Sequence, residues 1–180
     1  YREVADLLGQ GAVGLLPSDT IYGLSCAALN ESAVERIYRL KGRDYDKPMI
    51  ILLSDIEQAR RVGIDLAELE PVCHFWPAPL TVIVKASKQA PASLHRGSHQ
   101  LAVRVPDDER LRKLIRQTGP LVSTSANPQG QEPAETLEQA KYYFGDRLDF
   151  YIDAGEIKTS PSTLVRIENS KLSVLRQGAY

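Results

Sequence analysis

The sequence predicts an α/β fold in which helices flank a twisted, mixed β-sheet. Short apolar segments alternate with helix-forming segments over most of the 180 residues, as expected for a sheet covered by helices. The alternation ends near the carboxyl terminus, where 148–152, 162–167 and 172–176 resemble neighbouring strands without an intervening helix. Such a run favours a mixed sheet over a purely parallel one. The length suits one domain, and we expect residues 1–180 to form it.

Hydrophobic spacing and capping residues support the individual elements. The first helix, residues 2–8, has its apolar side chains on one face, and Gly9 and Gly11 end it. Asn30 or Ser32 can cap the next helix, which runs through Leu40. Further helices are predicted over 55–62, 65–74, 107–117 and 135–144. The remaining strands are predicted over 12–16, 21–27, 49–53, 81–86, 101–105 and 120–124.

Composition excludes several classes of protein. Hydrophobic residues make up 43% and charged residues 25%, near the globular average, so neither a disordered tail nor a fibrous repeat fits. The net charge is −1, so a phosphate or nucleic-acid partner must meet a local patch. Basic residues dominate 36–47 and 85–116, whereas acidic residues dominate 132–156, which is typical of a solvated helix face.

Cysteine content and hydropathy predict a cytoplasmic protein that does not enter a membrane. Cys26 and Cys73 form no C-x-x-C motif, so neither a disulfide framework nor a zinc site is expected. No apolar run approaches the roughly 18 residues of a spanning helix. The sequence begins at Tyr1 without an initiator Met, and we expect residues to precede it.

Two motifs that can mark ligand sites have structural interpretations here. Gly9–Gly14 matches the dinucleotide fingerprint G-x-G-x-x-G, but a helix precedes it and a strand follows, the reverse of the required order. His95 and His99 have the i, i+4 spacing of metal ligands, but Gly97 between them weakens a helix. We therefore predict neither a Rossmann site nor a metal site.

Two loops offer candidate ligand contacts. Lys41 and Arg43 stand two apart on a predicted extended loop, which would point them to one side, and Lys47 adds a third cation. Such a loop binds phosphate in some proteins but is more often a solvated turn. Ser123–Gly130 follows an apolar strand and can cradle a ligand or merely close a turn. Taken alone, neither loop decides between the two interpretations.

Seven ordered segments resemble motifs of the YrdC-like family. Leu16–Leu24 is similar to its P-T-[DE]-T-x-Y-G-L segment, and Lys41–Pro48 to its K-x-R-P-x-x-K-P loop. Further similar segments are Trp76–Thr81, Leu101–Pro106, Val122–Asn127, Ser162–Leu164 and Leu175–Gly178. The chain departs from the family pattern at Ser18, Leu52, Ala78 and Gln129. The resemblance spans nearly the whole chain and implies the short form of the family, a mixed sheet with a concave ligand-binding face.

The resemblance implies a threonylcarbamoyl-AMP synthase. Such an enzyme joins L-threonine, bicarbonate or CO2, and ATP into threonylcarbamoyladenylate and pyrophosphate. The product would pass to a tRNA threonylcarbamoyl-transferase complex that modifies position 37 of tRNA. Mg2+ is expected to arrive with ATP, and no resident metal site is predicted. The alternative is an RNA-binding or regulatory paralogue of the same fold, without synthase activity.

The resemblance also implies roles for particular residues. Lys41 and Arg43 are expected to act catalytically by stabilising charge, since no covalent nucleophile is needed. The expected threonine contacts are Thr20, Arg104, Ser125 and Ser162. The expected nucleotide contacts are Lys41, Arg43, Lys47, Asn127 and Arg176. Whether Glu135 or Thr136 also contacts the nucleotide stays open.

Overall fold

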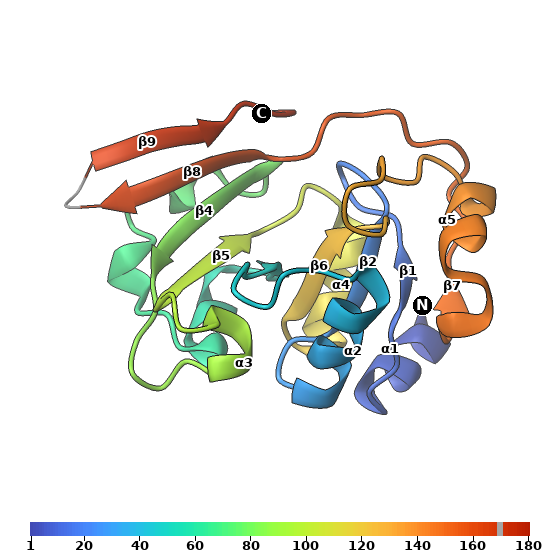
Figure 1. Ribbon diagram of the computed structural model, residues 1–180. Helices are drawn as coiled ribbons and strands as arrows, with labels where there is room; N and C mark the ends of the chain where they lie inside the picture. Colours follow the sequence, from blue (N-terminus) through green and yellow to red (C-terminus); the bar gives the residue numbers. More distant parts are fainter. Residues whose placement is uncertain (169–170) are drawn as a thin grey trace.

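The computed structural model describes residues 1–168 and 171–180, which form one mixed β-sheet with helices against it (Figure 1). The strands of the described residues follow the order β7-β1-β2-β6-β3-β5-β4-β8-β9. Parallel pairs join β1 to β7, β3 to β5 and β4 to β8, and the other neighbours are antiparallel. The predicted mixed α/β sheet is therefore confirmed. The strands are β1 (Gly14–Leu16), β2 (Gly23–Ala27), β3 (Ile50–Leu52), β4 (Leu80–Lys85), β5 (Gln100–Arg104), β6 (Leu121–Ser125), β7 (Phe150–Tyr151), β8 (Thr163–Glu168) and β9 (Lys171–Arg176).

The helices α2, α4 and α5 begin at polar side-chain caps and end at glycines. Asn30 caps α2 by accepting from the backbone N–H of Ala33 at 3.0 Å, and Gly42 ends that helix at a φ of 59°. Asp108 and Thr136 cap the next two long helices in the same way. The α-helices are α1 (Arg2–Gly9), α2 (Glu31–Lys41), α3 (Ala92–His95), α4 (Glu109–Thr118) and α5 (Leu137–Phe144). The 3-10 helices are η1 (Ile56–Val62), η2 (Leu66–Glu68), η3 (Cys73–Phe75) and η4 (Gly145–Arg147).

Some sequence-based predictions of secondary structure were wrong. The helix expected over 65–74 is two separate 3-10 turns, because Pro71 lacks an N–H and disfavours helical backbone in the residue before it. The segment 55–62 is also 3-10 and is capped by Asp55. The single turn α3 was not predicted, since Pro91 and Gly97 leave it only four residues. The strand expected over 148–152 is reduced to β7.

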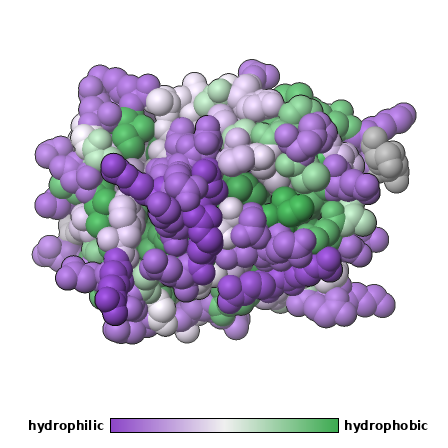
Figure 2. Space-filling model, turned by 180° about the vertical axis from the view of Figure 1, so that it is seen from behind, coloured by the Kyte–Doolittle hydropathy of each residue, from purple (hydrophilic) through white to green (hydrophobic). Residues whose placement is uncertain are grey.

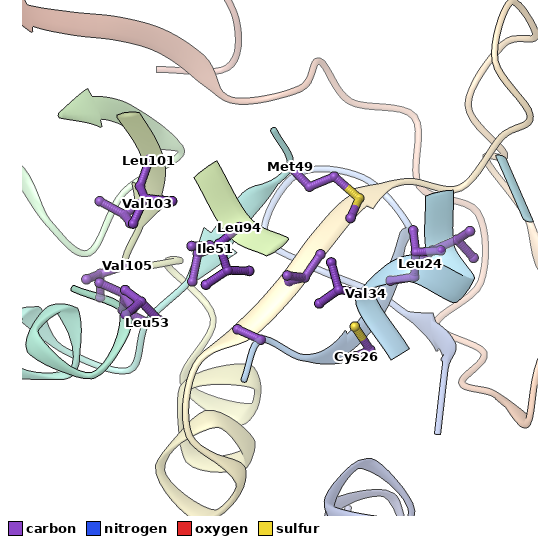
Figure 3. Close-up of a cluster of buried hydrophobic side chains, with 14 of the residues drawn as sticks. Leu24, Cys26, Val34, Met49, Ile51, Leu53, Leu94, Leu101, Val103 and Val105 are labelled. Carbon is purple, nitrogen blue, oxygen red and sulfur yellow. The ribbon is translucent and has the colours of Figure 1, made fainter. Parts of the chain in front are cut away.

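The two faces of the sheet bury different sets of side chains. The larger core lies on one face, where apolar side chains from β2, β3, β5, α2 and α3 converge, including Leu24, Ile51, Val103, Val34 and Leu94 (Figure 3). On the opposite face α1 and α4 pack against β1, β3 and β6. The buried side chains of this smaller core are Val4, Leu8, Leu16, Leu52, Leu111, Leu114, Ile115 and Leu121. Helices therefore cover the first face broadly and the second face at β1, β3 and β6.

Candidate functional site

A cavity of about 500 Å³ lies on the second face of the sheet, beside the α1 and α4 layer. Leu52 of the smaller core pairs with Arg104, and Ile50 pairs with Ala102, so these residues share that face. Ile83 continues the same row across β4. The lining from the sheet includes Ile50, Ile83, Ala102, Arg104, Leu164 and Arg166. This volume suits a nucleotide-sized ligand, and it gives the predicted concave face a location.

Most of the predicted site residues meet at this cavity. The lining includes Thr20, Arg43, Arg104, Ser125, Ser162 and Arg176. These side chains come from distant parts of the sequence, which only the sheet order brings together. Lys41, Lys47 and Asn127 are outside the lining residues. Neither Glu135 nor Thr136 belongs to the lining either, and Thr136 serves as the cap of α5.

The ionisable groups of the cavity lining are all cationic. They are the four arginines Arg43, Arg104, Arg166 and Arg176. Around them the lining has small hydroxyl side chains and apolar side chains. The face of the molecule seen from behind also mixes apolar surface with hydrophilic side chains (Figure 2). Four guanidinium groups in one recess concentrate positive potential, so the cavity favours anionic ligands.

Arg104, which the family resemblance implies as a threonine contact, is buried. Its Nη1 donates to Thr20 Oγ1 at 3.1 Å, and its Nη2 lies 3.5 Å from Asp19 Oδ1. Asp19 is fixed in turn by accepting from the backbone N–H of Asp107 at 2.9 Å. Burial lowers the pKa of Arg104, against the attraction of Asp19, and the neighbouring charge of Arg176 lowers it further. The Nε of Arg104 is buried without a hydrogen-bond partner among the described residues.

Asp19 is a site residue that sequence reasoning missed, although it stands within the segment that carried the resemblance. The side chains of Asp19 and Arg104 are each 5% exposed, so the pair is desolvated. A buried guanidinium without a counter-charge costs several kcal/mol. Asp19 therefore supplies the counter-charge that offsets the burial of Arg104. The signal available in the sequence was an acidic residue next to Thr20, within the segment that carries the resemblance.

The loop between β1 and β2 is held by hydroxyl groups and by the connection from β7 to β8. Ser18 Oγ donates to the carbonyl of Ile21 at 2.7 Å and lies 3.1 Å from Thr20 Oγ1. Thr159 Oγ1 donates to the carbonyl of Thr20. The hydroxyl of Tyr22 donates to the carbonyl of Gly155 at 2.8 Å, which fixes the same connection. Figure 1 shows this connection crossing over the ends of the central strands toward β8.

Ser162 and Arg176 are brought together by the pairing of β8 with β9. Arg176 Nη2 donates to the carbonyl of Ser162 at 2.8 Å, and Ser162 Oγ lies 2.7 Å from Thr81 Oγ1. Gly178 passes so close that a Cβ there would lie 2.1 Å from the carbonyl oxygen of Pro161. Only glycine fits this approach, so the L-R-x-G segment presents Arg176 at the cavity by a steric requirement.

Lys41 does not point to the same side as Arg43, and the prediction of one extended loop was wrong. Lys41 is the last residue of α2, and the left-handed Gly42 then turns the chain, so the two side chains diverge. The ammonium of Lys41 lies 2.5 Å from the carbonyl of Ser125, 2.6 Å from that of Asn127 and 3.2 Å from Asn127 Oδ1. Burial, with a smaller contribution from Arg43, lowers the pKa of Lys41 to about 7. Lys41 thus ties α2 to the loop after β6.

The loop after β6 is closed by its own side chains. Asn127 Nδ2 donates to the carbonyls of Gln131 at 2.6 Å and Pro128 at 3.2 Å, so both ends of its amide are engaged within the chain. Gln129, a departure from the family pattern, accepts from the backbone N–H of Asp44 at 3.0 Å. This loop and the loop after α2 therefore form one bonded unit beside the cavity.

Arg43 and Lys47 differ in their access to the cavity. Arg43 donates from Nε to the carbonyl of Lys47 and from Nη2 to that of Pro48, both at 3.0 Å, and it lines the cavity. Lys47 is exposed and pairs with Asp44 at 2.5 Å. The three loop cations were expected to cluster, but only Arg43 lines the cavity. Lys41 is buried against the loop after β6, and Lys47 is exposed in an ion pair.

An arginine outside the predicted set supports this loop. Arg96 stacks 4.0 Å over the ring of Tyr38 and 5.6 Å from the ring centre of Tyr45, and it pairs with Glu35 at 2.6 Å. Tyr38 also donates its hydroxyl to the carbonyl of Lys47 at 2.9 Å. Arg96 therefore connects the turn after α3 to α2 and to the loop that carries Arg43.

The candidate metal ligands do not form a recognisable metal site. Helix α3 ends at His95, and the rings of His95 and His99 stack with centroids 5.0 Å apart. Within residues 1–168 and 171–180, no group of three or more His, Cys, Asp or Glu side chains has the arrangement of metal ligands. In the same residues, no helix combines the length and apolar character needed to cross a membrane. Cys26 and Cys73 are both free thiols.

Comparison with known proteins identifies the relatives of this fold. A profile of the Sua5/YciO/YrdC family, described as "Telomere recombination", matches residues 6–178. The chain belongs to this family. A threonylcarbamoyl-AMP synthase of Vibrio vulnificus is 34% identical over 184 residues, covering 98% of this chain and 97% of the relative. One of Marinobacter nauticus is 40% identical over 144 residues, covering 77% and 75%. The resemblance predicted from sequence is confirmed.

Solved structures agree with the family assignment. Sua5 of P. abyssi complexed with L-threonine superposes with a TM-score of 0.90 at 31% identity, over 98% of this chain. The match covers 53% of that protein, so this chain spans about half its length. E. coli YciO superposes with a TM-score of 0.86 at 23% identity, over 98% of this chain and 88% of YciO, which shows the shared fold.

Proposed function

We propose that this protein is a threonylcarbamoyl-AMP synthase in which residues 1–180 act as one domain. The observation that carries the proposal is the cavity lined by four arginines and small hydroxyls, in a family whose members include named synthases. The reaction brings together a triphosphate, an amino-acid carboxylate and bicarbonate, and an all-cationic recess of about 500 Å³ is suited to several anions at once.

The threonine would bind where Arg104 meets Thr20. Arg104 has an unpaired Nε beside a hydroxyl, which suits a carboxylate that accepts from both. Ser162 and Ser125 line the same cavity and can bond the amino-acid hydroxyl or the carbamate. Support for threonine as the substrate comes from the relative Sua5, whose structure was determined with L-threonine.

The nucleotide would lie along Arg43 and Arg176. Both side chains use part of their guanidinium on backbone carbonyls and can offer the remaining donors to phosphate. Lys41 and Asn127 would support the nucleotide by fixing the loop after β6, since their hydrogen bonds are internal. Lys47, paired with Asp44 outside the cavity lining, would act on the nucleotide only through the shape of this loop.

The chemistry we propose needs no covalent intermediate on the protein. The threonine amine attacks CO2, a proton leaves the nitrogen, and the resulting carbamate oxygen attacks the α-phosphorus as pyrophosphate departs. Arg43 and Arg176 would stabilise the charge that moves onto the leaving group. Holding three reactants in line can lower the barrier by roughly 7 to 11 kcal/mol.

Magnesium would enter as part of the ATP complex. The cavity lining contains no carboxylate among the described residues, and Mg2+ commonly keeps waters and phosphate oxygens as ligands.

The adenylate would then pass to a tRNA threonylcarbamoyl-transferase complex in the cytoplasm. Bicarbonate is the proposed source of CO2. The RNA-binding alternative has less support, because the arginines line a recess and not an extended surface.

The deciding experiment measures pyrophosphate release by the full chain with ATP, Mg2+, bicarbonate and a single amino acid. Release should depend on threonine and exceed that with serine or valine, and mass spectrometry should detect the threonylcarbamoyl adenylate. Arg43→Ala should reduce the rate at least about tenfold, from losing a charge-assisted contact, while Arg39→Ala on the exposed side of α2 should not. Threonine-independent release, or none, would refute the proposal.

A further inference from the structure

We propose that Arg166 is a specificity-determining residue that binds the outer phosphates of the nucleotide, the part that leaves as pyrophosphate. This inference rests on the proposed function and extends it to a residue that no motif of the sequence singled out. Arg166 lies on β8 and lines the same cavity as Arg104 and Arg176. It is the one cavity arginine among the described residues without an expected ligand.

The sheet register fixes the position of Arg166 relative to the threonine end. Arg176 pairs with Leu164 across β8 and β9, and Arg166 stands two residues farther along β8. Strand geometry therefore separates the Cα atoms of Arg166 and Arg176 by about 8 Å. Arg104 is close enough to Arg176 for their charges to interact, and it contacts Thr20. Arg104 on β5, Arg166 on β8 and Arg176 on β9 thus form one cluster of arginines on the cavity side of the sheet.

The surroundings of Arg166 leave its Nε without a hydrogen-bond acceptor, while the side chain as a whole is 35% exposed. Ile83 pairs with Arg166 on one side and with Ala102 on the other, so the adjoining floor is apolar. Within the described residues Arg166 Nε is buried with no hydrogen-bond partner. The ion pair found for it joins Nε to Glu168 Oε1 at 3.8 Å, and the Glu168 side chain is 58% exposed.

A ligand that satisfies this cluster must carry more than one negative group. A buried guanidinium donor without an acceptor is costly, so a bound anion would recover that cost. A triphosphate meets this condition, because its phosphates can span the distance of about 8 Å between Arg176 and Arg166 and contact both. AMP lacks the outer phosphates and would leave Arg166 unsatisfied, so Arg166 would favour ATP over AMP.

The test compares Arg166→Gln and Arg166→Lys with the wild type and with Arg60→Gln, an exposed arginine paired with Glu57 and outside the cavity lining. Calorimetry measures the binding of MgATP, AMP and inorganic pyrophosphate to the full chain. Arg166→Gln should weaken MgATP and pyrophosphate about tenfold to a hundredfold, as expected for a lost charged contact. AMP affinity and the KM for threonine should stay at wild-type values. Arg166→Lys should recover part of the loss, since it retains the charge without the planar fork.

The outcomes separate this inference from the proposed function. Unchanged pyrophosphate binding in Arg166→Gln, or an equal loss for AMP and ATP, would overturn the role of Arg166 even if threonine-dependent turnover is observed. If the wild type binds pyrophosphate more tightly than Arg166→Gln but shows no threonine-dependent turnover, the synthase proposal is overturned and the role of Arg166 stands. If Arg166→Gln does not fold, the same comparison of ligands in Arg166→Lys decides.

Discussion

Replacing Lys41 by methionine should destabilise the protein as well as impair it. The ammonium of Lys41 bonds three oxygen atoms of Ser125 and Asn127 at 2.5, 2.6 and 3.2 Å, and the side chain is 4% exposed overall. Methionine has a similar length but no donor, so the variant leaves these acceptors unpaired. Unpaired buried acceptors cost about 1 to 3 kcal/mol each, less where water enters, so we expect a loss of about 2 to 4 kcal/mol.

Thermal and urea denaturation of both proteins at pH 6 measure this loss. At that pH, below the pKa of about 7, Lys41 is mainly protonated and makes its full set of bonds. For a chain of 180 residues each kcal/mol lowers the Tm by about 2 to 4 °C, so a fall of roughly 5 to 15 °C is expected. Lys113→Met, at an exposed position on α4, is the matched control and should melt with the wild type.

The reasoning fails if Lys41→Met melts with the wild type but loses pyrophosphate release. That result would mean that the ammonium contacts the nucleotide directly and that its bonds to the loop after β6 contribute nothing to folding. A lowered Tm together with weaker ATP binding would support the reasoning, because losing the Lys41 bonds would disorder the loop after β6.

Four further predictions test neighbouring residues and the protonation of Lys41. Arg104→Lys should raise the KM for threonine more than that for ATP in steady-state kinetics, because a point charge replaces the planar fork. Asn127→Ala should lower the Tm in thermal melts and weaken ATP binding in calorimetry together, since the amide is engaged within the chain and fixes the loop after β6. Arg43→Gln should raise the pKa of Lys41, because it removes the positive charge of Arg43, which lowers that pKa. NMR of the Lys41 side chain over a pH titration measures the change. Wild-type stability should also gain a contribution that rises between about pH 7 and 10.5, where the unfolded chain keeps the Lys41 proton and the folded chain does not.

The fold class could be predicted from the sequence because it depends on local hydrophobic patterns. Segments such as 101–105 and 120–124 are apolar and short, and the helix caps Asn30 and Asp108 act within one turn. The failures arose where a single residue overrides the pattern. Pro71 splits a segment with helix-like composition into 3-10 turns, and no periodicity count detects that.

The membership of the site could be predicted better than its geometry. Motif resemblance selected Thr20, Arg104, Ser162 and Arg176, and the sheet brings them to one cavity. The direction of each side chain depends on where an element ends, and Lys41 shows this most clearly. An extended loop would have placed it beside Arg43, but one further helical residue and a left-handed glycine direct it into the loop after β6.

Arg166 could not be recognised from the sequence because its position depends on register alone. In its local context it precedes Ile167 and Glu168 and has the pattern of an exposed charge near the edge of a sheet. Pairing with Ile83 places it on the cavity face, whereas its neighbour Val165 enters the larger core. A slip of one residue would exchange these two side chains, burying a charge in the core and removing an arginine from the cavity. The packing of Val165 in the core therefore fixes the register that presents Arg166 to a ligand, so the stability of the core and the anion specificity of the cavity depend on the same strand pairing.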